Sequence, residues 1–143
     1  MKSKTNDDWI IAEGLHEGQR LVVRMNIGAR PLIDSERYPY KVGIAIPFKS
    51  PLSDGMPNEV EIQRYARIED TIVNRFEVDH AGVPCIVITT QGMREFVVYS
   101  KTDNVSDIIE DASLHFPEYD FQHIVEYDKN WDEFRYWSER LGH

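Results

Sequence analysis

Apolar and polar positions alternate in the first part of the chain, which is the pattern of a half-buried strand. Residues 9–12 and 21–27 are β-prone runs, and Glu17-Gly18 between them supplies the residue types of a tight turn. The second run places apolar side chains on one face, while Arg24 and Asn26 project from the other. The pattern therefore predicts an N-terminal β-hairpin.

A loop and a third strand are expected next. Residues 28–39 contain glycine and prolines and are predicted to form a loop. Residues 41–46 then alternate again, with their larger side chains on one face. The other face of this strand carries only Gly43 and Ala45, which are small enough for a helix to approach closely.

The first helix is predicted to begin at Asn58. Asn58 and Glu61, three residues later, have the spacing of a capping box. Apolar residues then recur at helical spacing as far as Phe76. We expect one buried face to contain Ile62, Tyr65, Ala66, Ile72, Val73 and Phe76.

The remaining segments predict a second hairpin, a second helix, a last strand and a closing helix. The arms of the hairpin are residues 85–89 and 95–100. The second helix covers about 104–116, and the last strand lies within 119–127. The closing helix begins near Asn130 and is rich in aromatic residues.

The order of these elements predicts the fold class. From residue 40 to residue 127 it is β-α-β-β-α-β, the ferredoxin-like or split βαβ arrangement, in which both helices lie on one face of an antiparallel sheet. We therefore predict an α+β fold in a single domain, residues 1–143. The added N-terminal hairpin and C-terminal helix are expected to extend a sheet edge or to cover the face that the two helices leave open.

The charge of the chain narrows the choice of partners. Among 143 residues, 25 Asp and Glu outnumber 16 Lys and Arg, which gives a formal net charge of −9. This charge disfavours nucleic acid and anionic membranes, and it suits a basic protein partner or simple solubility. The sequence shows neither a signal peptide nor an apolar stretch long enough to cross a bilayer, so we expect no membrane association and a cytoplasmic location.

No recognisable catalytic or metal-binding pattern occurs in the sequence. The single cysteine, Cys85, lies in an apolar strand-like run and is predicted to be a small buried hydrophobe. The five histidines fall in separate elements, without the spacing of metal ligands. Glycine patterns that cradle phosphate are absent from the sequence. We therefore predict no catalytic residue, no metal and no cofactor.

Five residues are candidates for a binding role. Arg24, Asn26 and Arg94 lie on or beside strands and would suit a polar recognition surface, although the solubility of an edge strand explains them equally well. Tyr136 and Trp137 lie in the closing helix and point partly away from its buried face. Exposed aromatic side chains often mark contact sites, while ordinary core packing is the alternative.

Short motifs follow one another along nearly the whole chain. They are Trp9, Arg24-Met25-Asn26, Tyr38-Pro39 leading into Val42-Gly43-Ile44, Asp54-Gly55-Met56-Pro57, Ile68-Glu69-Asp70, Thr89-Thr90-Gln91-Gly92-Met93-Arg94-Glu95-Phe96 with Tyr99, and Asp128-Lys129-Asn130-Trp131-Asp132-Glu133-Phe134. In this order they resemble the bacterial family catalogued as domain of unknown function 695. The resemblance implies no established activity. Some members are joined to a domain similar to the regulator of ribonuclease activity B, an acidic ribonuclease inhibitor, and we expect no such second domain here.

Two hypotheses for function follow. The first is a non-catalytic protein-binding or regulatory domain that acts on a basic partner, such as a nuclease or toxin. The second is a small-molecule-binding or weakly enzymatic domain with a polar pocket around Arg24, Asn26 and Arg94. The sequence does not predict the oligomeric state.

Overall fold

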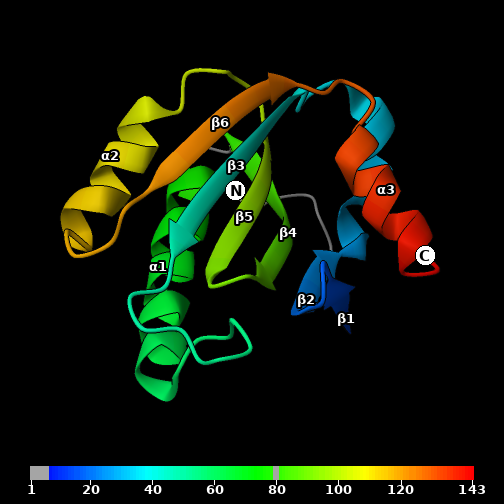
Figure 1. The fold of residues 1–143 in the computed structure, drawn as a ribbon. Helices are drawn as coiled ribbons and strands as arrows, with labels where there is room; N and C mark the ends of the chain where they lie inside the picture. The colour runs from blue at the N-terminus through cyan, green and yellow to red at the C-terminus, as the bar shows by residue number, and fades with distance from the viewer. Residues whose placement is uncertain (1–6, 79–80) are drawn as a thin grey trace.

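The computed structural model describes residues 7–78 and 81–143, and its centre is a six-stranded antiparallel sheet (Figure 1). The strands are β1 (Trp9–His16), β2 (Gln19–Asn26), β3 (Tyr40–Pro47), β4 (Gly82–Thr90), β5 (Met93–Ser100) and β6 (Gln122–Tyr127). Their order in the sheet is β1-β2-β4-β5-β3-β6, and every neighbouring pair is antiparallel. The predicted α+β class is confirmed.

Helices cover both faces of this sheet (Figure 1). On one face lie α1 (Glu59–Val78) and α2 (Ser106–His115), which share a core cluster with β3, β4 and β5. On the other face lie η1 (Ile27–Ser35), a 3-10 helix, and α3 (Asp132–Arg140). The prediction that the two central helices share one face is therefore confirmed.

The N-terminal hairpin makes the sheet larger than the four-stranded ferredoxin-like core that was predicted. β2 pairs with β4 over five residue pairs, from Leu21↔Thr90 to Met25↔Ile86, so the six-strand order differs from that of a four-stranded sheet. Of the two roles left open by the sequence, the hairpin extends a sheet edge. The closing helix α3 covers the face that α1 and α2 leave open.

Both hairpins turn through two residues with positive φ. Glu17 and Gly18 have φ values of 51° and 78°, and Gln91 and Gly92 have 52° and 80°. Such turns match the right-handed twist of the flanking strands, and glycine adopts positive φ at no steric cost. The turn predicted at Glu17-Gly18 is confirmed.

The buried face of α1 differs from the prediction. Asn58 caps the helix as expected, because its Oδ1 accepts the Glu61 amide at 2.9 Å. The Glu61 carboxylate, however, is buried and accepts the backbone amides of Lys49 and Ser50 at 2.8 and 2.9 Å. This rotates the buried stripe onto Glu61, Tyr65, Ile68, Ile72 and Phe76.

Two of the residues predicted to be buried in α1 are therefore exposed. Ile62 is 51% exposed, and Ala66 also faces solvent, while Val73 is half-buried. The prediction for Ile62 and Ala66 is wrong because hydrogen bonds draw Glu61 inward, an effect that apolar periodicity does not register.

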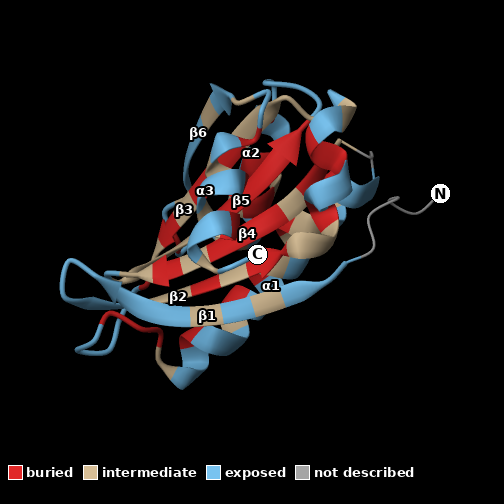
Figure 2. Cartoon of the chain, turned by 90° about the vertical axis from the view of Figure 1, so that its right-hand side faces the viewer, coloured by how far each residue is buried: buried red, intermediate tan, exposed pale blue. Residues whose placement is uncertain are grey.

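Residues 27–35 form a helix where the sequence predicted a loop. η1 contains Pro31, but Ala29, Leu32 and Ile33 have helical spacing and pack into the core cluster of the α3 face. This segment contacts β1 and β4. In Figure 2 the strands at the centre of the sheet are coloured mainly as buried, whereas β1 at the edge is largely exposed.

Trp131 anchors α3 to the sheet. Its ring is buried and stacks on Tyr99 with the centroids 4.1 Å apart, and its indole N–H donates to the Tyr38 carbonyl at 2.8 Å. The Tyr99 hydroxyl donates to Asp128 at 2.8 Å and accepts the Phe134 amide at 3.2 Å. The start of the helix is thus tied to β5 by stacking and by hydrogen bonds.

Trp131→Ala should lower the free energy of unfolding by about 3–5 kcal/mol, because it removes a buried aromatic and leaves a cavity. Urea denaturation followed by circular dichroism measures this. Tyr136→Ala in the same helix is the control and should change stability by only about 0.5 kcal/mol, since its side chain is exposed. An unchanged midpoint for Trp131→Ala would show that the indole does not anchor α3.

Cys85 is fully buried in β4, as predicted, and its thiol donates to the Val83 carbonyl at 3.2 Å. Burial raises the pKa of this thiol, so little nucleophilic thiolate forms.

Cys85→Ser should destabilise the fold by about 1–3 kcal/mol, because it places a hydroxyl in an apolar site. The native thiol should resist a bulky maleimide until the protein unfolds, and rapid labelling in native buffer would contradict this.

Candidate functional site

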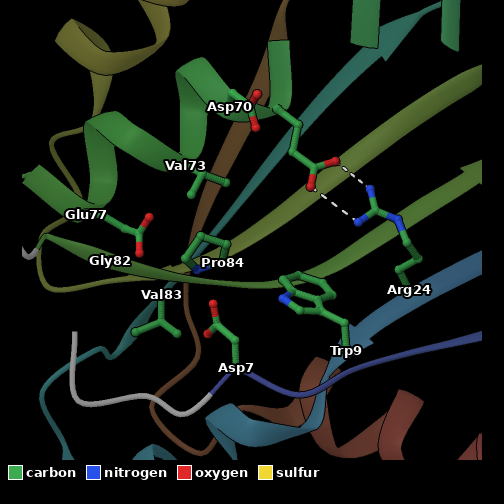
Figure 3. A pocket seen from close by; sticks show the side chains of 10 residues that line it. Asp7, Trp9, Arg24, Asp70, Val73, Glu77, Gly82, Val83 and Pro84 are labelled. Atoms are coloured by element: carbon green, nitrogen blue, oxygen red, sulfur yellow. Dashed lines mark hydrogen bonds and ion pairs between the residues drawn. The ribbon is translucent and has the colours of Figure 1, made fainter. Parts of the chain in front are cut away.

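A cavity of about 270 Å³ opens between α1 and the ends of β1 and β4 (Figure 3). Its polar lining comes from elements that are distant in sequence: the segment entering β1, the middle of β2, and the outer flank of α1. The side chains that set its chemistry are Asp7, Trp9, Arg24, Glu69, Asp70 and Glu77.

Among the described residues that line the cavity, Arg24 is the only basic one, and Glu69 already pairs with it. Nη2 of Arg24 lies 2.5 Å from Oε1 of Glu69, and Nη1 lies 3.3 Å from Oε2, a forked arrangement that joins β2 to α1 (Figure 3). The guanidinium also lies over the Trp9 ring, 5.7 Å from its centroid. The positive charge of Arg24 is therefore largely neutralised in place.

The remaining charge of the cavity is negative. The described residues of its lining include four carboxylates and one guanidinium, which together have a formal charge of three negative units. Figure 3 shows Glu77 and Asp7 extending toward the space between α1 and the N-terminal segment, with the Trp9 indole at its side. A negatively charged hollow with an aromatic wall can bind an ammonium or guanidinium group.

Asn26 holds the N-terminal segment at the cavity. Its side chain is buried, Nδ2 donates to Asp7 Oδ1 at 3.1 Å and to the Pro84 carbonyl at 3.4 Å, and Oδ1 accepts the Asp8 amide at 3.0 Å. Both the oxygen and the nitrogen of the side-chain amide are therefore hydrogen-bonded. Asn26 therefore positions Asp7 and does not offer free polar atoms to a ligand.

Arg94 lies behind the cavity, beneath α1. Its guanidinium lies over the rings of Tyr65 and Phe48, 5.6 and 5.9 Å from their centroids, and Nε donates to the Thr89 hydroxyl at 2.8 Å. Burial lowers the pKa of Arg94, and Arg24 nearby lowers it further. The structure thus places Arg24 in the lining of the cavity, while Asn26 is buried outside the lining and bonds to Asp7. Arg94 packs under the helix.

Tyr136 and Trp137 lie on the opposite face of the sheet from this cavity. Trp137 is half-buried, and its indole N–H donates to Glu133 at 3.3 Å. Tyr136 is 51% exposed and contacts Trp137 edge to face, with the centroids 5.2 Å apart. The two predicted aromatic contacts are therefore separate from the acidic cavity.

Sequence reasoning did not predict the four carboxylates and the tryptophan that line the cavity as site residues. Asp70 and Glu77 are seven residues apart, or two helical turns, and therefore lie on the same side of α1. The sequence alone could therefore have placed these two carboxylates on one side of the helix. The contribution of Asp7 and Trp9 depends on where β1 pairs, which local spacing does not encode.

The sequence matches the family of unknown function DUF695 over residues 7–137. The chain belongs to this family. No curated protein and no solved structure matches the chain. All the residues that line the cavity fall inside the matched range, so the cavity is part of the DUF695 region.

Two further findings concern the described part of this DUF695 chain. No group of three or more His, Cys, Asp or Glu side chains within residues 7–78 and 81–143 is placed to hold a metal ion. Among the helices described there, none is both long and apolar enough to cross a membrane.

A second polar cluster lies on the α3 face of the sheet, around Lys41. Its ammonium pairs with Glu133 at 2.8 Å and Glu126 at 3.1 Å. Glu95 fills the room above Gly43, where an added Cβ would lie 2.7 Å from Glu95 Oε2. The space predicted for a closely packed helix is thus occupied by a carboxylate. Burial raises the pKa of Glu95, the Glu133 carboxylate raises it further, and Lys41 partly offsets both.

Glu95 should make stability fall as pH rises. Because its pKa is raised in the folded state, folded chains bind more protons than unfolded chains between the unfolded pKa of about 4.3 and the folded value. The free energy of unfolding therefore decreases as pH rises through this window and stays lower above it. Glu95→Gln should flatten this slope in urea titrations at several pH values. An unchanged slope would show that Glu95 does not titrate in this window.

Proposed function

We propose that this DUF695 domain is a non-catalytic binding module that recognises a basic segment of a partner protein at the acidic cavity beside α1. One observation carries the proposal: within residues 7–78 and 81–143, the cavity is lined by four carboxylates, an indole and a single basic group, which is already paired. A lysine or arginine side chain would complement both the charge and the aromatic wall.

Apolar surface beside the cavity supports a protein as the partner. Ile62 lies two helical turns before Glu69 on the same flank of α1 and is 51% exposed. Ile11 pairs across the strands with Arg24, so its side chain lies on the α1 side, and it is 66% exposed. A protein segment would bury such side chains together with the charge contact, whereas a small ion would not.

The small-molecule alternative has less support. Arg24 lines the cavity, but Glu69 already pairs with its guanidinium. Asn26 lies outside the lining, and its amide bonds to Asp7, Asp8 and Pro84. Arg94 lies outside the lining. A polar or anionic ligand would therefore find few free donors and several repelling carboxylates.

The proposal includes two narrower inferences. Residues 40–127 are interpreted as a split βαβ unit, which the element order and the neighbouring positions of β4, β5, β3 and β6 support. The formal charge of −9 favours a basic protein over nucleic acid as the partner. A cytoplasmic location remains a prediction from the sequence.

A short oligolysine peptide tests the cavity. Asp70→Asn combined with Glu77→Gln removes two cavity charges and should weaken peptide binding by on the order of tenfold, since electrostatic attraction and a local contact are lost together. Asp103→Asn combined with Glu110→Gln is the matched control, because it removes two exposed charges elsewhere. Fluorescence anisotropy at physiological salt measures both affinities.

The control variant distinguishes binding at the cavity from a general attraction of the peptide to the negative net charge. Equal losses in the two double variants would show that the peptide senses only the net charge, and this would contradict the proposal. Binding of an RNA or DNA oligonucleotide to the purified chain would contradict it as well.

A further inference from the structure

β1 forms one edge of the sheet and pairs only with β2 among the described residues. The eight residues of β1 extend to the turn of the hairpin and include neither proline nor lysine. Glu13 is the one Asp, Glu, Lys or Arg among them. Edge strands in natural proteins are usually protected by such residues, by bulges or by a covering helix. No register shift occurs in the pairing of β1 with β2. Among the described residues, the edge is therefore protected by the single charge of Glu13 and by neither a proline, a lysine nor a bulge.

The register identifies which main-chain groups point outward. His16 and Gln19 close a two-residue turn and are therefore a hydrogen-bonded pair. Hydrogen-bonded pairs then recur at every second residue, and the Ile27 amide bonds to the Asp8 carbonyl at 2.9 Å in keeping with this phase. The residues that direct N–H and C=O groups away from β2 are Trp9, Ile11, Glu13 and Leu15.

The same four residues place their side chains on the α1 side of the sheet, because Ile11 is paired with Arg24. Three of them are exposed apolar residues: Ile11 at 66%, Leu15 at 76% and Trp9, which also lines the acidic cavity. Outward main-chain groups and exposed apolar side chains thus belong to one continuous surface that ends at the cavity.

We infer that β1 receives an extended basic segment of a partner protein as an additional antiparallel strand. The inference rests on the proposed function for the charge of that segment. Strand addition supplies main-chain hydrogen bonds, while alternate side chains provide the specificity. The basic character is set here by Asp7, Asp8 and Glu17, acidic residues next to β1, whereas Glu13 within the strand is paired with Arg20 at 2.6 Å.

A second copy of this chain is a poorer occupant of the edge. Each copy has a formal charge of −9 and would bring the same acidic residues to the contact. Like charges placed opposite one another oppose association. Charge complementarity therefore favours a basic strand from another protein.

Antiparallel pairing makes a specific demand on the incoming strand. Residues whose amides bond to Ile11 and Glu13 lie directly opposite them, and directly opposite residues project to the same face. The basic side chains on the α1 side and the amides that face β1 therefore belong to the same residues of the partner. Methylation of these amides should abolish pairing, whereas methylation of the intervening amides should not.

A short peptide that alternates lysine and valine provides the test in three forms. The plain peptide and the peptide N-methylated on its valines should bind with similar affinity. The peptide N-methylated on its lysines should bind about tenfold more weakly or worse, because several main-chain hydrogen bonds are lost together. Anisotropy titrations with the full chain measure all three.

Variants of β1 test the same contact from the other side. Glu13→Pro removes one outward N–H without removing a bond to β2, and proline is tolerated at such positions. It should weaken binding of the plain peptide, while Glu13→Ala, which keeps the N–H, should weaken it less. His123→Pro on the opposite edge strand, β6, is the control and should leave binding unchanged.

The outcomes separate this inference from the proposed function. If all three peptide forms bind alike while Asp70→Asn with Glu77→Gln still weakens binding, strand addition is wrong and the cavity proposal stands. If Glu13→Pro and lysine N-methylation abolish binding but the cavity variants have no effect, the edge contact is supported and the cavity proposal fails. A concentration-dependent dimer that Glu13→Pro disrupts would overturn the assignment of a foreign strand.

Discussion

The structure depends on the need to cover both faces of β4 and β5. Residues 96–99 of β5 are four consecutive buried residues, with Phe96 and Val98 in the core cluster of α1 and α2, and Val97 and Tyr99 in that of η1 and α3. A strand with two apolar faces is stable only between two layers. The helices are accordingly placed over the centre of the sheet. On the α1 side, the residues of the N-terminal hairpin nearest its free edge are left open to solvent.

Polar contacts then convert this open region into a shaped cavity. The Arg24–Glu69 pair ties β2 to α1, and Asn26 fixes the segment that carries Asp7. Each of these interactions satisfies groups that would otherwise be partly buried without partners. Together they neutralise Arg24, and the described part of the lining holds no second basic residue for the remaining carboxylates. The acidic character of the cavity is thus a consequence of how the hairpin is attached.

Several of the motifs that carry the family resemblance lie at two places in the fold. Trp9, the Arg24-Met25-Asn26 segment and the Glu69-Asp70 pair surround the cavity and hold its walls. The segment from Asp128 to Trp131 forms the anchor of α3 through Tyr99 and Tyr38. The first group therefore lies at the proposed binding surface, and the second stabilises the layer on the opposite face.

The sequence by itself determined the class of the fold and most of its elements. Alternation and turn residues located both hairpins, and the Asn58 cap located the start of α1, because these signals act over a few neighbouring residues. Contacts between residues distant in sequence determined the features that local spacing does not predict. They rotated α1 so that Glu61 is buried and Ile62 exposed, folded η1 despite Pro31, and paired the hairpin with β4. The cavity depends on that last pairing, since Arg24 and Glu69 are 45 residues apart and meet only when β2 lies beside β4 and under the flank of α1.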